Sequence, residues 1–346
     1  MSKGEDFGKP GIKIRKGLYI LIRILKSFDS AAYYIIWLKF LQVLNIPVDY
    51  FFYLLEKVTR KRGLNRQFPI VFVVGIQRTG STLVSQFIEK SFDFFPVGNF
   101  NSIFHRSSYY LHKWFSNGYN GAHASYKNFY GISKGFYSIG DCYELWDKWF
   151  GENHYVIPDY ISEEKQKNLW QYFASLHKAY QKPLLTKNNR NSLLLPIFQK
   201  NFKDVFFVIV KRDPIAVIRS TLKASKDFFG DEKFLWGLYP SKDFDTSDYE
   251  NIVEAATVQY LMLDKILNQQ IKNLTDDSFL IIDYNDFCKN PVDFQKKLLN
   301  QLNIKGISVN EVQISTEAFK ISERLTNQDL DKQIEYFLRK WENNVP

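Results

Sequence analysis

The segment Pro69–Val74 constrains the fold of this 346-residue chain more than any other. It reads Pro-Ile-Val-Phe-Val-Val, an almost wholly apolar run that is bounded by proline and glycine. Such a run suits a central parallel strand that is buried on both faces. Residues 75–80 follow as a loop with a glycine at each end, and residues 81–89 can form the next helix. The segment therefore predicts a strand–loop–helix unit.

Two further apolar runs, at residues 205–210 and 279–282, predict more strands of the same sheet. Helices are expected after them, from about residue 215 and over about 291–302. Short apolar strands that alternate with helices indicate an α/β fold with a doubly wound parallel sheet. We assign this domain, with a P-loop-like nucleotide site, to residues 67–346. Residues 92–160 read as an aromatic-rich insert of loops and short helices that would bind the acceptor.

Residues 1–66 form an N-terminal helical, basic amphipathic segment in this interpretation. Apolar residues recur at helical spacing from Ile14 to Leu25 among lysines and arginines, and Pro47 marks a break before a second helical piece at 50–58. Because amphipathic helices usually face a core, we expect this segment to pack on the main domain. The alternative is a peripheral contact of residues 12–62 with anionic lipid. No transmembrane helix is expected, since the most apolar stretch, 31–44, is shorter than about 20 residues.

The composition limits the partners and cofactors. The net charge of +9 suggests an anionic partner, which could be nucleic acid, a membrane surface or a polyanionic small molecule such as a nucleotide. Two cysteines and five histidines, without CxxC or HExxH spacing, argue against a zinc enzyme. The cysteine usage does not decide the redox compartment. We expect no bound metal and a cytoplasmic location, which can include association with a membrane.

The loop after the first strand carries the most informative motif, Gly-Ile-Gln-Arg-Thr-Gly-Ser-Thr-Leu at residues 75–83. Its glycines allow a tight turn, so that backbone N–H groups at a helix N-terminus can converge on phosphate oxygens. Ser81 and Thr82 can donate hydroxyl hydrogen bonds, and Arg78 supplies a fixed charge. A nucleoside triphosphatase loop would need lysine where Ser81 stands. A P-loop kinase or nucleotidase, with Asp283 holding a metal ion, remains the alternative.

A second motif, Lys-Arg-Asp-Pro-Ile-Ala-Val-Ile-Arg-Ser at residues 211–220, follows the second strand. Arg212 leaves the carboxyl end of this strand, where open α/β sheets bind ligands, and Ser220 lies about two helical turns further on. Arg212 can hold one phosphate while the first loop holds another. By itself such a turn is also ordinary helix capping.

Together the two motifs resemble the nucleotide-binding signature of sulfotransferases that use 3′-phosphoadenosine 5′-phosphosulfate (PAPS). Gln-Arg-Thr-Gly-Ser-Thr-Leu resembles the family's PRSGTTL-type loop, and residues 185–189 and 282–291 resemble two further family elements. The resemblance covers about residues 67–305 and is strongest to the bacterial and tyrosylprotein-type branch. It implies transfer of a sulfuryl group from PAPS to a hydroxyl or amine of a glycan, lipid, secondary metabolite or peptide tyrosine. Adenosine 3′,5′-bisphosphate (PAP) is the implied product, without a metal and without a nucleic-acid partner.

The resemblance also implies roles for individual residues. The 5′-phosphosulfate would be held by Arg78, Thr79, Gly80, Ser81 and Thr82. Arg212 and Ser220 would hold the 3′-phosphate, and Tyr284 would lie near the adenine. Lys187, with Arg78, would stabilise charge on the sulfuryl and bridging oxygens.

The general base is not fixed by the resemblance. Asn99 stands where the tyrosylprotein-type branch keeps a glutamate, and an amide cannot usefully accept a proton. Asp141 and Glu144 lie among aromatic residues that could raise a carboxyl pKa, and on a helix their spacing of three would put them on one face. His154 and then His105 are the alternatives, since neutral histidine is a natural base near pH 7.

Overall fold

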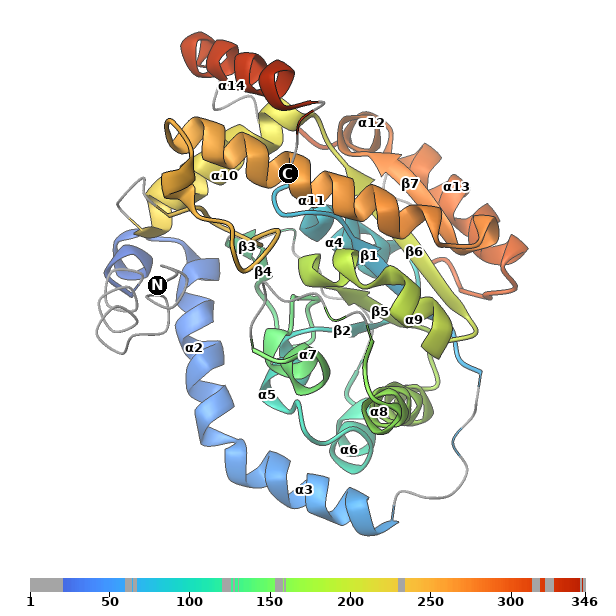
Figure 1. Ribbon diagram of the computed structural model, residues 1–346. Helices are drawn as coiled ribbons and strands as arrows, with labels where there is room; N and C mark the ends of the chain where they lie inside the picture. The colour runs from blue at the N-terminus through green and yellow to red at the C-terminus, as the bar shows by residue number, and fades with distance from the viewer. Residues whose placement is uncertain are drawn as a thin grey trace.

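Strand β1, Ile70–Val74, lies at the centre of a parallel sheet whose strand order is β2-β5-β1-β6-β7 (Figure 1). The computed structural model describes residues 21–59, 64, 67–119, 126, 128–129, 131–152, 158, 160–229, 234–312, 318–320, 327–342 and 344. From β1 the chain moves first to one side of the sheet, through β2 and β5, and then to the other, through β6 and β7. This change of direction is the point at which doubly wound sheets bind ligands.

The strands and helices have the following bounds. The strands are β1, β2 (Phe95–Val97), β3 (Asn128–Phe129), β4 (Ile132–Ser133), β5 (Leu184–Lys187), β6 (Val205–Lys211) and β7 (Phe279–Asp283). The helices up to β5 are α2 (Ser30–Leu44), α3 (Ile46–Thr59), α4 (Ser81–Ser91), α5 (Asn99–Ile103), α6 (Tyr110–Ser116), α7 (Tyr143–Phe150) and α8 (Glu163–Tyr180). Those after β5 are α9 (Leu195–Asn201), α10 (Pro214–Phe229), α11 (Ile252–Lys272), α12 (Tyr284–Lys289), α13 (Pro291–Ile304) and α14 (Gln328–Trp341).

Alternate side chains of β1 pack into two separate cores, one on each face of the sheet. Ile70, Phe72 and Val74 join the core that α7 to α11 complete. Val71 and Val73 join the core of α4, α12 and α13. All five residues of β1 are fully buried, which is why the sequence shows no polar alternation there.

The predicted fold class is confirmed, and the three apolar runs are strands β1, β6 and β7. The sequence analysis assigned no strand to β5 or β2. Strand β5 has only four residues and ends in Thr186 and Lys187, and β2 contains Pro96, so neither forms a recognisable apolar run. Within residues 92–160 the described parts contain short helices and the small antiparallel pair β3–β4. The boundary near residue 66 stays a prediction.

Helices α2 and α3 pack against the sheet domain, but α3 does so through polar residues and not through its apolar side, which the amphipathic pattern would have placed against the core. Leu38 of α2 lies in a small core with Phe100 and Leu111, from α5 and α6. Two buried carboxylates of α3 hold the loop before α6. Asp49 accepts hydrogen bonds from the backbone of residues 106 and 107, and Glu56 accepts them from the backbone of residues 108–110. Buried carboxylates that accept several N–H bonds tie this segment firmly to the domain.

None of the helices described is by itself long and apolar enough to cross a membrane. The pair α2 and α3, bent by 53° at its break, meets the length and composition of a span only when the two are taken together.

Candidate functional site

The carboxyl ends of the sheet strands bring the two sequence motifs together. The loop at residues 75–80 follows β1, and parallel pairing sets Val73 beside Lys187 at the end of β5. On the other side of β1, strand β6 leads into Arg212, and Lys211 of β6 pairs with Asp283, directly before Tyr284. Four separate segments therefore converge at the one edge of the sheet where ligands bind in this fold.

Gly80 allows the loop after β1 to close against β7. Its φ of 96° is left-handed, and a Cβ there would lie 2.2 Å from the ring of Tyr284. Arg78 is also left-handed, with φ of 66°. As the N-cap of α4, Gly80 has no side chain that could occupy the free N–H groups of the first turn. The loop thus keeps the helix N-terminus open to an anion.

Arg78, Ser220 and Arg212 form one polar cluster beside this loop. Arg78 Nε donates to Ser220 Oγ at 2.9 Å, and Arg212 Nη1 donates to the carbonyl of Arg78 at 3.2 Å. The guanidinium of Arg212 also lies over the ring of Tyr284, 4.6 Å from its centroid. Arg212 Nε is buried and has no hydrogen-bond partner within the described residues. A half-buried cation with a buried, unsatisfied donor atom favours an anionic ligand here.

Thr82, Lys187 and Asp141 meet on the other side of the loop. Lys187 Nζ donates to both carboxylate oxygens of Asp141 at 2.9 Å. A Cβ on Gly131 would lie 3.5 Å from Asp141 Oδ2, 3.6 Å from Thr82 Oγ1 and 3.7 Å from Lys187 Nζ. A hydroxyl, a carboxylate and an ammonium group are therefore brought to one point in the cavity. The lysine side chain is only 2% exposed, so the ion pair is shielded from water.

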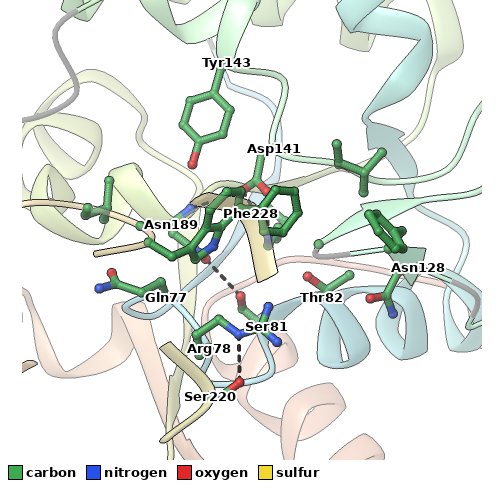
Figure 2. A pocket seen from close by; sticks show the side chains of 18 of the residues that line it. Gln77, Arg78, Ser81, Thr82, Asn128, Asp141, Tyr143, Asn189, Ser220 and Phe228 are labelled. Carbon is green, nitrogen blue, oxygen red and sulfur yellow. Dashed lines mark hydrogen bonds and ion pairs between the residues drawn. The ribbon is translucent and has the colours of Figure 1, made fainter. Parts of the chain in front are cut away.

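Ser81 and Asn189 connect the loop to the segment after β5. Ser81 Oγ donates to Asn189 Oδ1 at 3.0 Å, and Figure 2 shows this contact together with the one between Arg78 and Ser220. Asn189 belongs to the segment that resembles a family element, yet the sequence analysis gave it no role. Thr79 donates instead to the carbonyl of Ile76 at 2.9 Å, within the loop itself.

The expectation that Asp141 and Glu144 share a helix face is wrong. Cys142 has a left-handed φ of 47° and α7 begins at Tyr143, so Asp141 lies before the helix. Glu144 forms an ion pair with Lys39 of α2. Burial raises the pKa of Glu144, but the charge and hydrogen bond of Lys39, together with further hydrogen bonds to the carboxylate, lower it more, and the net pKa lies below the usual value. The carboxyl is thus held ionised by α2, whereas Asp141 faces Lys187.

The other candidates for the base are placed as follows. His154 lies outside the described residues. His105 does not line the cavity, and burial followed by the charge of Arg106 lowers its pKa. Asn99 donates from Nδ2 to the carbonyls of Ser133 and Gly135 at 2.8 and 2.7 Å, so it supports the strand pair β3–β4. Asp141 is the predicted base that the structure brings to Lys187 and Thr82.

A cavity of about 1310 Å³ joins these groups and extends beyond them. Such a volume exceeds the 300–1,000 Å³ or so of a pocket for one ligand. The cavity lining also includes apolar residues, among them Phe228 and Trp236, which stack at 4.1 Å between centroids. Leu38 and Lys39 of α2 line it too. The sequence analysis assigned no site role to these residues, because aromatic residues are frequent throughout the chain and give no local signal. Among the described residues no group of three metal-binding side chains occurs.

The chain is similar to a known protein family and to several solved structures. A model of the sulfotransferase family matches residues 69–307. The solved structure of sulfotransferase STF9 from Mycobacterium avium has 11% identity and a TM-score of 0.47, covering 82% of this chain and 70% of its own. For STF1 from Mycobacterium tuberculosis H37Rv the identity is 11%, the TM-score 0.47, and the coverage 80% and 77%. A sulfotransferase domain from the curacin biosynthetic pathway has 15% identity and a TM-score of 0.39, and the match covers 82% of this chain and 93% of that domain. No curated protein sequence matches the chain.

The close approach of Gly80 to Tyr284 can be tested with a matched glycine. Gly306 has a similar φ of 79°, but a Cβ there would meet nothing within 4 Å. Gly306→Ala should cost about 1–3 kcal/mol of unfolding free energy through backbone strain alone. Gly80→Ala should cost clearly more, since the ring of Tyr284 must also move. Urea denaturation measures both, and equal losses would contradict the packing of Tyr284 against the loop.

Proposed function

Because the chain belongs to the sulfotransferase family, we propose that it transfers a sulfuryl group from PAPS to a hydroxyl or amine of an acceptor. The observation that carries the proposal is the convergence of Thr82, Lys187 and Asp141 beside the loop that follows β1. A second cluster around Arg212 lies on the other side of the same loop. Two separate anion-binding groups suit a nucleotide that carries phosphate on both ends of its ribose.

The residues fit the donor as follows in this proposal. The open N-terminus of α4, with Ser81 and Thr82, would bind the 5′-phosphosulfate. Arg212 and Ser220 would bind the 3′-phosphate, for which the unsatisfied Nε of Arg212 is available. Tyr284, which already stacks with the guanidinium of Arg212, would flank the adenine. The remaining cavity volume, whose lining includes apolar residues, would receive the acceptor.

The transfer itself needs a base and a source of positive charge. The acceptor oxygen or nitrogen attacks the sulfur, the bond from sulfur to the 5′-phosphate oxygen breaks, and PAP leaves with that electron pair. We assign the acceptor proton to Asp141, which lines the cavity next to Lys187. Lys187 stabilises the charge that develops on the sulfuryl and leaving oxygens. Arg78 and Lys187 supply at the sulfuryl group the positive charge that a metal ion provides in kinases.

A P-loop kinase or nucleotidase is not favoured by the family match. The position that would hold its lysine is Ser81, which contacts Asn189. Asp283, which the alternative required as a metal ligand, instead caps α12 by accepting from the N–H groups of Asn285 and Asp286. The carboxylate of Asp283 is therefore engaged in capping the helix.

The first prediction concerns the 3′-phosphate. Arg212→Ala should lose the discrimination between PAP and AMP, because only PAP carries the phosphate that Arg212 would hold. Loss of a charge-assisted contact costs about 1.5–3 kcal/mol, or about ten- to a hundredfold in affinity for PAP. Isothermal titration measures both affinities. Lys211→Ala is the matched control, since this neighbouring lysine pairs with Asp264 and does not line the cavity.

If Arg212→Ala weakens the affinities for PAP and for AMP equally, Arg212 does not hold the 3′-phosphate.

The second prediction concerns the base. Asp141→Asn should lower turnover by about 10²–10⁴-fold and remove the acidic limb of the pH–rate profile, while PAP affinity should not fall. Lys187→Ala should also slow turnover, through lost charge stabilisation, but should keep that limb. Release of PAP from PAPS, with water as a slow acceptor, provides the assay. Glu144→Gln serves for comparison, because its carboxylate is paired with Lys39. If the acidic limb survives in Asp141→Asn but vanishes in Glu144→Gln, the base is Glu144 and not Asp141.

A further inference from the structure

The outward side of α2 and α3 is apolar and aromatic, the reverse of the polar face that a surface helix normally turns to water. Trp37 and Phe40 of α2 are 52% and 53% exposed, and Phe51 of α3 is 62% exposed. We define the outer face as these three residues together with the other exposed hydrophobic residues of the two helices. These are Tyr33, Val43, Leu44, Ile46, Val48, Tyr50, Leu54, Leu55 and Val58. So many exposed hydrophobic side chains on two adjoining helices indicate an interaction surface.

The charged residues of α2 and α3 point away from the outer face or carry positive charge. Asp49 and Glu56 are buried against the domain, at 0% and 1% exposure. Lys39 pairs with a carboxylate of α7. The ammonium of Lys57 lies over the ring of Tyr53, 4.8 Å from its centroid. The helix pair thus presents aromatic and aliphatic groups outward without a carboxylate among them.

The positive charge of the chain is concentrated in the same segment. Residues 12–62 contain ten lysines and arginines against three acids, a net charge of +7, whereas the whole chain carries +9. Two of the three acids are the buried carboxylates of α3. The basic run 60–62 follows directly after α3 in the sequence. A positive segment that carries an exposed apolar face complements an anionic lipid surface.

We propose that the outer face docks α2 and α3 onto the surface of an anionic lipid bilayer, with both helices lying in the plane of the interface. The helices have 15 and 14 residues, so each is shorter than the roughly 20 residues that cross a bilayer. Tryptophan and tyrosine settle at the lipid–water boundary. Phenylalanine is common on the apolar face of helices that lie in the interface. A second copy of the chain suits the face less well, because docking it would bring two strongly positive segments together.

Docking would also place the cavity close to the lipid. Leu38 and Lys39 line the cavity from the inner side of α2, while Trp37 and Phe40 lie on its outer side. The two sides of one helix are about 10–12 Å apart. In Figure 1 α2 and α3 run along one edge of the molecule, with the sheet on their inner side. The docking proposal does not depend on the proposed sulfuryl transfer.

The test is sedimentation of the full chain with vesicles of phosphatidylcholine alone and with equal parts of phosphatidylglycerol. We expect the chain to bind the anionic vesicles at least about tenfold more strongly than those of phosphatidylcholine alone. This binding should weaken as the salt concentration is raised. The variant Trp37→Ser/Phe40→Ser/Phe51→Ser should bind at least about tenfold less. The matched control Tyr160→Ser/Ile304→Ser/Tyr336→Ser removes three equally exposed hydrophobic side chains elsewhere and should bind as the unchanged chain does.

Two results would overturn the proposal. One is a folded, full-length chain that sediments with neither kind of vesicle. The other is a chain that is dimeric without lipid, becomes monomeric in the outer-face variant, and gains no affinity from phosphatidylglycerol; the face would then bind a second copy. Thermal unfolding of the outer-face variant close to that of the unchanged chain excludes misfolding as the cause of lost binding.

Discussion

The parallel hydrogen-bonded pairing of β1 with β5 and β6 is the constraint on which the candidate site depends. It sets the ends of three strands, and then of β7, at one edge of the sheet. The loop after β1 can close there only because Gly80 leaves room for the ring of Tyr284. The same contact positions Tyr284 over Arg212. The proposed bisphosphate site would therefore be assembled by backbone geometry, with side chains added from four separate segments.

The polar groups of this site are paired with one another in the structure. Lys187 contacts Asp141, and Arg78 contacts Ser220. Pairing keeps buried charges from being left unsatisfied, and it holds each group near the position where an anionic ligand would meet it. An anion at the loop would compete with Asp141 for Lys187, which would free the carboxylate to face the acceptor. This exchange links donor binding to the proposed base.

The parts of the fold that could be predicted are those that depend on local sequence patterns. β1, β6 and β7 are continuous apolar runs, and the glycine loop and the Arg-Asp-Pro turn are recognisable by spacing. The burial of Lys187 could not be predicted, because it depends on Asp141, 46 positions earlier in the chain. The separate directions of Asp141 and Glu144 depend on one left-handed residue, Cys142, which has no sequence signature. Likewise, a hydrophobic pattern shows that α3 has an apolar side, but only the buried Asp49 and Glu56 show that this side faces outward.

We propose that the carboxyl edge of the sheet binds a 3′,5′-bisphosphate nucleotide without a metal ion. The most direct measurement is the thermal stability of the unchanged chain with PAP in the presence of EDTA, compared with ATP and Mg²⁺. A ligand that binds only the native state raises the unfolding temperature by mass action, so PAP should stabilise the chain and EDTA should not weaken the effect. Stabilisation by ATP and Mg²⁺ without any by PAP would contradict the account.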